Sequence, residues 1–383
     1  MLMMKQANRL FWSGKPYDLE GTEERFIAAM RENCLYQYEH CADYRRILEE
    51  AGFDPHSIRS MEDLYKLPFL PTLYLKRHKM FSVAPGKLLI KATSSGTSGG
   101  VKSEIGFDAG SLVRGLGMVL TVGRYHKLWS IKPVHYLIFG FQPARDNQTA
   151  ISKTALGFTF FAPALSRTYA LRHVKGGGYR LDMESMKAAF VRYAKSKAPV
   201  RTVGFPAYTY FLLKEMQEAG IRLKLPKGSL VTLGGGWKQF YAQKVEKREF
   251  YRLVWDVLGV PEENVVEFFG AVEHPILYTD CRSHHFHVPV YSRVVVRDPD
   301  TFEPVPCGQV GLINLMTPMV RSVPLISVMT DDIGILHDPA AEGNPCPCGE
   351  RAPWLEIIGR VGVRDIVTCA AGAEELLKGE GKA

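Results

Sequence analysis

The chain of 383 residues lacks the features that mark membrane, secreted and disordered proteins. No apolar run approaches the roughly 18 residues that a membrane-spanning helix needs, because Gly157 and Pro163 interrupt the segment at 155–165. Lys5 and Arg9 break the apolar stretch at the N-terminus, and no small-residue cleavage site follows it. Internal repeats and low-complexity tracts are absent. We therefore expect a folded, water-soluble, cytoplasmic protein with no membrane span.

The sequence also lacks the marks of a nucleic-acid-binding protein, although its charge is positive. Lys and Arg number 48 against 40 Asp and Glu, and the net charge of +8 suits nucleotides, nucleic acids, lipid head groups or acyl carriers. In the most basic stretch, residues 238–252, Glu246 and Glu249 recur at helical spacing, which indicates a solvated helix face. No nucleic-acid-binding motif accompanies this stretch. We therefore expect no nucleic-acid partner.

Cysteine is sparse and odd in number. Seven cysteines cannot all be paired, which favours a reduced compartment. A Cys-x-Cys pair and a second Cys followed by His offer the ligands of a tetrahedral structural zinc site: Cys281, His287, Cys346 and Cys348. A reduced Cys-x-Cys turn without metal is an equally good interpretation, and His284 and His285 are alternative ligands. Cys34, Cys41 and Cys307 suggest no role beyond packing.

Hydrophobic periodicity predicts an α/β protein with mostly parallel strands. The opening part, 1–85, is mostly helical, and Ser60 and Asp63 form a capping pattern there. Helices and strands alternate over an α/β core, 86–273, and a β-rich part follows over 274–360. The remaining 361–383 form a short tail. The expected helices are 22–38, 111–122, 183–193, 208–217 and 243–258, and the expected strands are 87–93, 135–141, 201–205, 229–233, 265–269, 288–297, 310–316, 325–329 and 354–358.

The most informative motif follows the first expected strand. Over 93–103, glycines let successive backbone N–H groups point at one anion, hydroxyls add donors, and Lys102 adds positive charge. The Walker pattern fails by one position, because Val101 stands where its second glycine belongs. A polar surface loop is the alternative. We predict a phosphate-binding loop made of Ser94, Ser95, Gly96, Thr97, Ser98, Gly99, Gly100 and Lys102.

This loop resembles the phosphate loop of the adenylate-forming superfamily of acyl-CoA synthetases. Further matches follow in the superfamily's order, at residues 234–238, 267–273, 329–333 and 359–360. The second match is similar to a Tyr-Gly-x-Thr-Glu motif, with Phe269 replacing Tyr and Val272 replacing Thr. The third is similar to a Thr-Gly-Asp motif, with Asp331 at the Gly position. The loss of the threonine hydroxyl removes a contact that the superfamily makes to a phosphoryl group.

The resemblance implies ATP and Mg²⁺ as cofactors. Glu273 is matched to the metal-binding carboxylate, and Asp332 and Arg360 are matched to the ribose-binding pair. The neighbouring His274 fits either a core or a substrate-site histidine. Besides the phosphate loop, the resemblance implies nucleotide-binding roles for Gly234, Gly235, Gly236, Phe269, Gly270, Asp332 and Arg360.

Nearly the whole chain resembles the acyl-protein synthetase (LuxE-like) family, which is close to the phenylacetate-CoA ligases. Residues 62–69 and 346–349 match the latter branch, whereas 268–275 and 287–293 match the acyl-protein synthetases. The resemblance implies the adenylate-forming (ANL-like) N-terminal domain over 1–360, without the usual C-terminal lid domain. Cys369 matches the family's acyl-accepting cysteine, and a thiolate is a strong nucleophile toward an activated acyl group. An inert surface or packed cysteine is the alternative.

The implied function is the ATP-dependent activation of a long-chain fatty acid to acyl-AMP, followed by its transfer to Cys369 as a thioester. An acyl-CoA or fatty acid reductase is the implied partner. Lys102 and Glu273 are the residues expected to act on the phosphates, Glu273 through Mg²⁺. Two other interpretations remain open: a phenylacetate-type acyl- or aryl-CoA ligase, and a non-enzymatic basic binding module.

Overall fold

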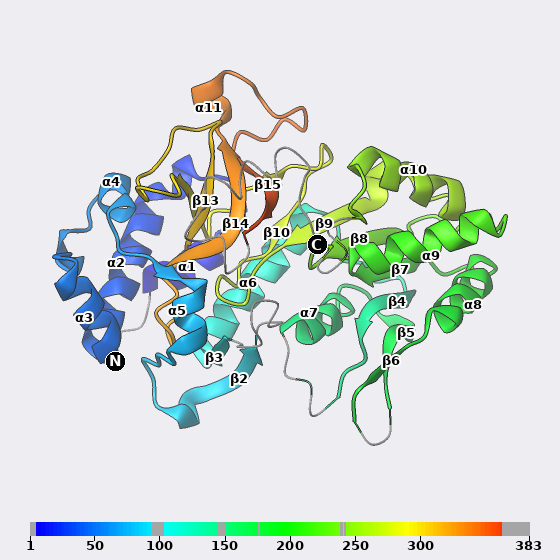
Figure 1. Ribbon diagram of the computed structural model, residues 1–383, viewed down its shortest axis with the longest axis horizontal. Helices are drawn as coiled ribbons and strands as arrows, with labels where there is room; N and C mark the ends of the chain where they lie inside the picture. Colours follow the sequence, from blue (N-terminus) through cyan, green and yellow to red (C-terminus); the bar gives the residue numbers. More distant parts are fainter. Residues whose placement is uncertain are drawn as a thin grey trace. The chain divides into compact units, whose positions relative to one another are not determined.

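A computed structural model describes residues 5–93, 103–144, 147, 150–174, 177–237, 240 and 243–361. The chain divides into two units, which are coloured along the sequence in Figure 1. Of the described residues, unit 1 contains those from 5 to 125 and from 270 to 361, and unit 2 contains those from 126 to 269. This division differs from the sequence-based boundaries at 85 and 273, because strands from the opening and closing parts of the chain share one sheet in unit 1.

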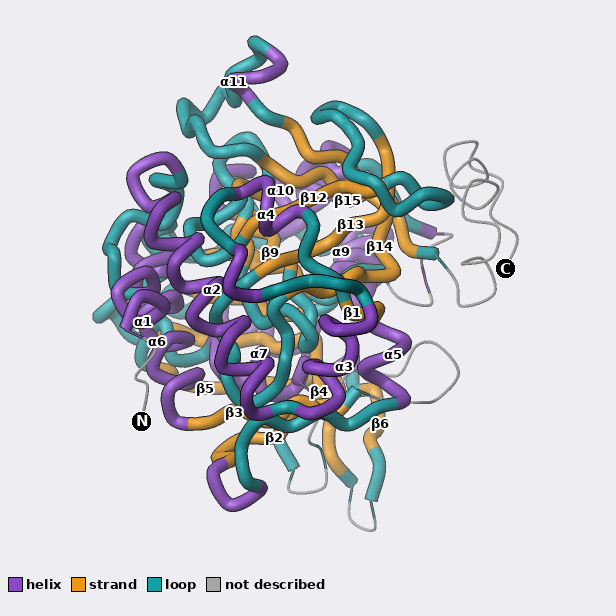
Figure 2. The backbone as a smooth tube through the Cα atoms, turned by 90° about the vertical axis from the view of Figure 1, so that its left-hand side faces the viewer, coloured by secondary structure: helices purple, strands orange, loops and turns teal. Residues whose placement is uncertain are grey.

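The helices of unit 1 are held by a buried stripe on α2. Phe26, Met30 and Cys34 recur at one-turn intervals and are fully buried. Asn33 is buried beside them and donates a hydrogen bond of 2.9 Å to the carbonyl of Val320, which joins the start of the chain to a distant segment. Figure 2 shows α1, α2 and α6 in purple, and α1 contacts both of the others. The helices are α1 (Lys5–Phe11), α2 (Glu23–His40), α3 (Ala42–Glu50), α4 (Met61–Tyr65), α5 (Thr72–Arg77), α6 (Ala109–Tyr125) and α11 (Pro339–Glu342).

The main sheet of unit 1 is built around β14. This strand pairs antiparallel with β13 and β15, and in parallel with the short β1 from the opening part of the chain. The order is β11-β15-β14-β13-β12, with β1 on β14. Its strands are β1 (Leu70–Pro71), β11 (Phe286–His287), β12 (Arg293–Arg297), β13 (Val310–Met316), β14 (Ser327–His337) and β15 (Trp354–Arg360). Unit 1 also contains β10 (Tyr278–Thr279) and a hairpin of β2 (Leu88–Thr93) and β3 (Glu104–Asp108).

Unit 2 is a mostly parallel sheet with helices on both faces. Its order is β9-β8-β7-β4-β5-β6, and only the β5–β6 pair is antiparallel. Alternate residues of β4 face opposite sides, as expected for a strand: Leu137 and Phe139 pack with α8, α9 and α10, and Tyr136 and Ile138 pack with α7. The elements are β4 (Val134–Phe141), α7 (Ala150–Phe158), β5 (Ala164–His173), β6 (Tyr179–Leu181), α8 (Met183–Ala194), β7 (Val200–Gly204), α9 (Pro206–Glu218), β8 (Leu230–Gly234), α10 (Lys247–Leu258) and β9 (Val265–Phe269).

The predicted α/β alternation is confirmed in unit 2, and the capping box at Ser60 and Asp63 is present at the start of α4. The strand predicted at 288–297 is wrong in its first half: β12 begins at Arg293, and Pro289 in the preceding turn has no N–H for a ladder. β14 continues to His337, well beyond the predicted 329. The elements that were not predicted are the helices α7 and α11 and the strands β1, β3, β5, β6, β10 and β11. None of the helices in the described part of the chain combines the length and apolar character that crossing a membrane requires.

Candidate functional site

Arg360 contacts two carboxylates at the end of β15. The pairing of β14 with β15 places Arg360 opposite Asp332. Its Nε lies 3.7 Å from Asp332 Oδ1, and its Nη2 lies 3.4 Å from Asp331 Oδ2. The arginine side chain is 45% exposed, whereas the two aspartate side chains are 8% and 16% exposed. The structure thus brings together Asp332 and Arg360, the pair that the sequence predicted as ribose ligands.

Asp331 has a structural role at this site that was not predicted from the sequence. Its Oδ1 accepts a hydrogen bond of 2.7 Å from the Thr72 hydroxyl, and its Oδ2 lies 3.7 Å from Lys76 Nζ. Both partners are on α5, which follows β1 directly, and β1 pairs with β14 just before Asp331. No local motif announces this contact, because it depends on a parallel pairing of two distant segments. Asp331 therefore anchors Arg360 from a buried position.

Glu273 is a buried carboxylate whose donor set suits a divalent cation. The side chain is 6% exposed, and Oε1 accepts a 2.5 Å hydrogen bond from the hydroxyl of Ser103. Its Oε2 accepts no hydrogen bond from the described residues, and no Lys or Arg among them forms an ion pair with Glu273. Mg²⁺ prefers carboxylate oxygens as protein ligands, and Glu273 offers one that the described residues leave without a hydrogen bond. Glu273 therefore fits the predicted Mg²⁺ site.

His274, next to Glu273, is a core histidine. It is fully buried, and its Nε2 lies 3.0 Å from the hydroxyl of Ser292. Burial lowers the pKa of His274 to about 3, so the ring stays neutral at physiological pH. Of the two roles that the sequence allowed, the structure supports the core role.

Several predicted residues lie outside the described part of the chain. They include the acyl-accepting candidate Cys369, Lys102, and the other phosphate-loop residues Ser94, Ser95, Gly96, Thr97, Ser98, Gly99 and Gly100. The described strands on either side of that loop, β2 and β3, pair antiparallel from Thr93 with Glu104. The strand predicted before the loop is therefore confirmed.

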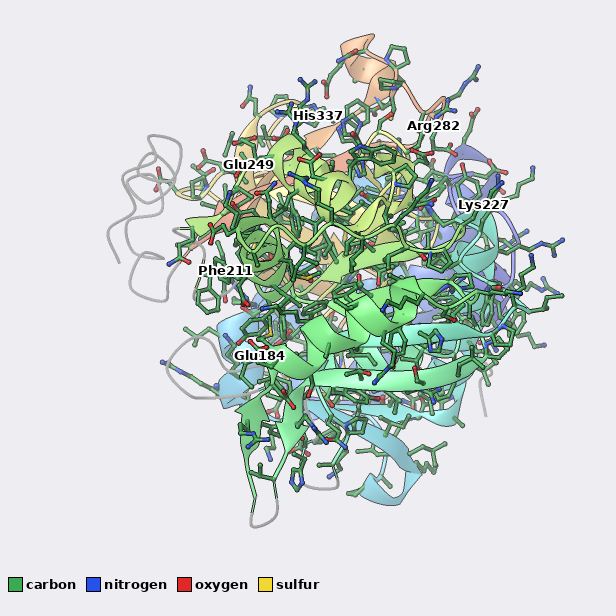
Figure 3. The ribbon with its side chains drawn as sticks, turned by 90° about the vertical axis from the view of Figure 1, so that its right-hand side faces the viewer. Glu184, Phe211, Lys227, Glu249, Arg282 and His337 are labelled. Atoms are coloured by element: carbon green, nitrogen blue, oxygen red, sulfur yellow. The ribbon has the colours of Figure 1, made fainter. Side chains whose placement is uncertain are left out.

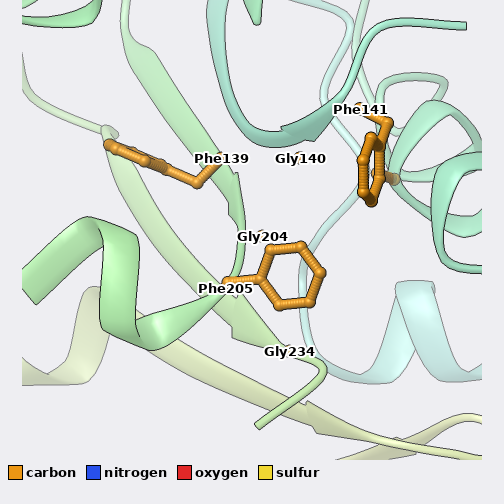
Figure 4. A pocket seen from close by; sticks show the side chains of 7 residues that line it. Phe139, Gly140, Phe141, Gly204, Phe205 and Gly234 are labelled. Atoms are coloured by element: carbon orange, nitrogen blue, oxygen red, sulfur yellow. The ribbon is translucent and has the colours of Figure 1, made fainter. Parts of the chain in front are cut away.

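A small apolar pocket in unit 2 lies at the carboxyl ends of β4, β7 and β8. Figure 4 shows its lining: Phe139, Gly140, Phe141, Ala155, Gly204, Phe205 and Gly234. The strand order reverses at β4: the next strand along the chain, β5, lies on one side of β4, and the later strands β7, β8 and β9 lie on its other side. Open α/β sheets bind ligands at such a reversal of strand order, outside the carboxyl ends of the strands. The pocket thus has the position of a ligand site.

The predicted adenine-site glycines begin at this pocket. Gly234 ends β8 and lines the pocket, and Gly235 and Gly236 have positive φ of 85° and 67°. These angles turn the chain sharply away from the strand end, which residues with a Cβ rarely allow. Phe269 ends β9, and Gly270 is the first residue of the second segment of unit 1.

We expect Gly204→Ala to destabilise unit 2. Gly204 has a φ of +138°, and a Cβ there would overlap the carbonyl oxygen of Phe139 on the neighbouring strand. Strained backbone of this kind costs about 1–3 kcal/mol, and the clash adds to it. Gly177→Ala is the matched control, because Gly177 has a φ of +100° but open space around it. Urea unfolding should show the larger loss for Gly204→Ala; equal losses would contradict the clash.

The structure brings the predicted Cys/His metal ligands together in unit 1. One donor atom from each of Cys281, His287, Cys346 and Cys348 lies within 4.8 Å of every other. Of the alternative ligands, His284 contacts Asp280 Oδ2 through Nδ1 at 2.7 Å, whereas His285 lies beside the cluster, with Nδ1 3.3 Å from Cys346 Sγ. No disulfide links the cysteines in the described residues. The cluster is therefore available to bind a metal ion.

The chain is similar to known ligases over most of its length. The chain is 26% identical over 383 residues to a long-chain-fatty-acid–luciferin-component ligase of Aliivibrio fischeri, covering 99% of this chain and 96% of that protein. The corresponding ligase of Vibrio harveyi is 27% identical, with 95% and 92% covered. A phenylacetate-coenzyme A ligase of Thermus thermophilus is 26% identical, with 87% of this chain and 69% of that protein covered.

The fold is also similar to a solved structure. The crystal structure of 2-hydroxyisobutyryl-CoA ligase in complex with 2-HIB-AMP superposes on this chain with a TM-score of 0.66. The two chains are 18% identical, and the superposition covers 90% of this chain and 69% of the ligase chain. The predicted α/β fold of adenylate-forming ligases is thus confirmed over most of the chain. The model of the acyl-protein synthetase family LuxE matches residues 3–378. The chain therefore belongs to the LuxE acyl-protein synthetase family, a group of adenylate-forming ligases.

Proposed function

We propose that this protein uses ATP to activate a long-chain fatty acid as acyl-AMP and then transfers the acyl group to Cys369 as a thioester. The family, and the similarity to two ligases named for long-chain fatty acids, support this substrate class. The thioester would pass to a fatty acid reductase, a partner that would meet it in the cytoplasm.

The observation that carries the proposal is the pairing of Arg360 with Asp331 and Asp332. Asp332 and Arg360 offer a carboxylate acceptor and a guanidinium donor at one strand position, which suits the hydroxyls of a ribose. The buried carboxylate of Asp331 forms an ion pair with the guanidinium of Arg360. A hydrogen bond from Thr72 and an ion pair with Lys76 fix the position of that carboxylate. The arginine is half exposed, so it can reach a ligand while remaining anchored.

Glu273 is proposed to hold Mg²⁺, with Ser103 fixing the orientation of its carboxylate. When bound, Mg²⁺ offsets charge on the phosphate oxygens. Lys102, which lies outside the described residues, would add positive charge at the same phosphates.

The first half-reaction needs no general base. The ionised fatty carboxylate attacks the α-phosphorus of ATP; a carboxyl-oxygen-to-phosphorus bond forms, the bond to the bridging oxygen breaks, and pyrophosphate leaves. In the second half, the thiolate of Cys369 attacks the acyl carbonyl carbon and AMP leaves with its phosphate oxygen. The protein then carries the acyl group as a thioester.

ATP–pyrophosphate exchange tests the first half directly. We expect exchange in the presence of long-chain fatty acids, because acyl-AMP formation is reversible. A series of fatty acids of increasing length, beside aryl acids, would identify the preferred substrate. A complete lack of exchange with every acid would rule out adenylation and leave the basic binding module.

A phenylacetate-type CoA ligase is the second candidate, and the similarity to the Thermus thermophilus ligase favours it. The two candidates differ in their products. With CoA present, a CoA ligase releases free acyl-CoA, whereas the proposed enzyme labels its own chain. Product analysis after incubation with a radiolabelled acid separates them.

A further inference from the structure

The strongest unassigned feature of the molecule is the cluster of three sulfurs and one imidazole in unit 1. The Sγ atoms of Cys281 and Cys346 are 3.8 Å apart, and Cys348 Sγ is 3.3 Å from His287 Nε2. A tetrahedral zinc ion with Zn–S bonds of about 2.3 Å places neighbouring sulfurs about 3.8 Å apart. The Cys281–Cys346 pair therefore has the spacing of two ligands on one zinc ion, and all four donor atoms lie within 4.8 Å of one another.

The backbone around the cluster supplies hydrogen-bond donors to two of its sulfurs. The N–H of Ser283 donates to Cys281 Sγ, and the N–H of Glu350 donates to Cys348 Sγ, each at 3.3 Å. In both loops the donor lies two residues after the cysteine. Two of the three sulfurs are therefore held in place by a backbone amide of their own loop.

His287 is held in the tautomer that a metal ligand requires. Its Nδ1 lies 2.7 Å from the carbonyl oxygen of Ala352, which can only accept a hydrogen bond, so Nδ1 carries the proton. The lone pair of Nε2 is therefore directed at the sulfur cluster. Metal-ligating histidines typically have such a second partner, which fixes the ring orientation.

Arg282, labelled in Figure 3, lies beside the two loops that carry Cys281 and Cys348. Its guanidinium donates to the carbonyl oxygens of Pro347 and Cys348, at 3.3 and 3.1 Å, and so joins the two ligand loops. Zinc bound by three cysteines and one neutral histidine carries a net charge of about −1, which a nearby arginine complements.

The cluster lies where β15 begins. His287 on β11 pairs with Trp354, the first residue of β15, and its ring is bonded to Ala352 just before that strand. Trp354 is stacked between two histidines, with ring centroids 4.8 Å from His285 and 5.0 Å from His337 (labelled in Figure 3). At its other end, β15 carries Arg360 opposite Asp332.

We propose that Cys281, His287, Cys346 and Cys348 bind one structural Zn²⁺, which fixes the start of the strand that ends at Arg360. All four positions of a tetrahedral ion are filled by protein, so the metal has no open position for a reacting ligand. This role is separate from Mg²⁺ at Glu273 and goes beyond the proposed function. It can be tested without any assay of acyl transfer.

The first test is metal content. The full chain, purified without added metal and without a metal-chelating tag, is expected to contain about one zinc ion per chain. Cys348→Ser should lose most of this zinc, whereas Cys307→Ser, a free cysteine outside the cluster, should retain it. Cobalt exchanged into the wild-type protein should give the thiolate-to-metal charge-transfer absorption of a tetrahedral site. The cobalt spectrum is measured on the wild-type protein. The proposal can therefore still be tested if the Cys348→Ser variant does not fold.

The second test is amide hydrogen exchange before and after zinc removal by a chelator. We expect faster exchange over 354–360 in β15 and unchanged exchange over 230–234 in β8 of unit 2. A wild-type protein that contains no zinc and gives no tetrahedral cobalt spectrum overturns the metal site. A zinc-loaded protein whose β15 exchange does not respond to the chelator overturns the role in fixing that strand.

Discussion

We expect Cys369→Ser to abolish stable labelling of the protein by a radiolabelled fatty acid, while ATP–pyrophosphate exchange continues. In the proposed reaction the two halves use different groups: adenylation depends on the nucleotide site, and acyl transfer depends on the thiolate. A serine hydroxyl is almost entirely protonated at neutral pH and is a far weaker nucleophile, so we expect labelling to fall by a factor on the order of 100 or more.

The matched control for this experiment is Cys307→Ser, which replaces a free cysteine that the proposal does not use. It should label like the wild type. Undiminished labelling of Cys369→Ser would show that another residue accepts the acyl group. Loss of exchange together with labelling would show instead that Cys369 is needed for adenylation or for folding, and the assignment as acyl carrier would fail.

Arg360→Ala is expected to weaken ATP binding and to slow exchange at subsaturating ATP. Hydrogen bonds to charged groups contribute about 1.5–3 kcal/mol each, so the loss of one to the ribose should raise the KM for ATP by roughly 10–150-fold. The substitution also removes a cation from beside Asp331, but Lys76 remains there, which limits the effect on folding.

Arg351→Ala is the control, because Arg351 is an exposed arginine close to the start of β15. Its KM for ATP should match that of the wild type. Arg360→Lys keeps the charge but has a single ammonium group, which cannot engage both aspartates in the manner of a guanidinium, so an intermediate KM is expected. An unchanged KM in Arg360→Ala would refute the ribose-binding role.

Much of unit 2 is predictable from local sequence. β9 was predicted with both ends correct, because Val265 and Val266 start a short apolar run between a helix and a glycine. β5 was missed because its apolar and polar residues do not alternate regularly, and Arg167, Arg172 and most of its other side chains are exposed or half-exposed. Such a pattern does not separate an edge strand from a loop without knowing its neighbours.

The site residues also divide into those that local sequence predicts and those that depend on distant parts of the chain. Asp332 and Arg360 belong to short motifs that can be recognised along the sequence, and the structure pairs them. Asp331 occupies a motif position where a glycine is expected, and its hydrogen-bond partner Thr72 is 259 residues away along the chain. The four members of the Cys/His cluster were predicted together from ligand chemistry, because few residue types bind zinc. Its geometry depends on the pairing of β11 with β15, which no local pattern announces.

The division of the chain into units has a consequence for its synthesis on the ribosome. All strands of unit 2 have been made once residue 269 emerges, so that sheet can form while the chain is still growing. Unit 1 cannot do the same, because Leu70 of β1 pairs with Val328 of β14. The buried stripe of α2 and the apolar side chains around β1 must wait for the closing segment, and pairings over such long separations form slowly. The nascent opening helices are therefore the part of this protein most in need of a chaperone.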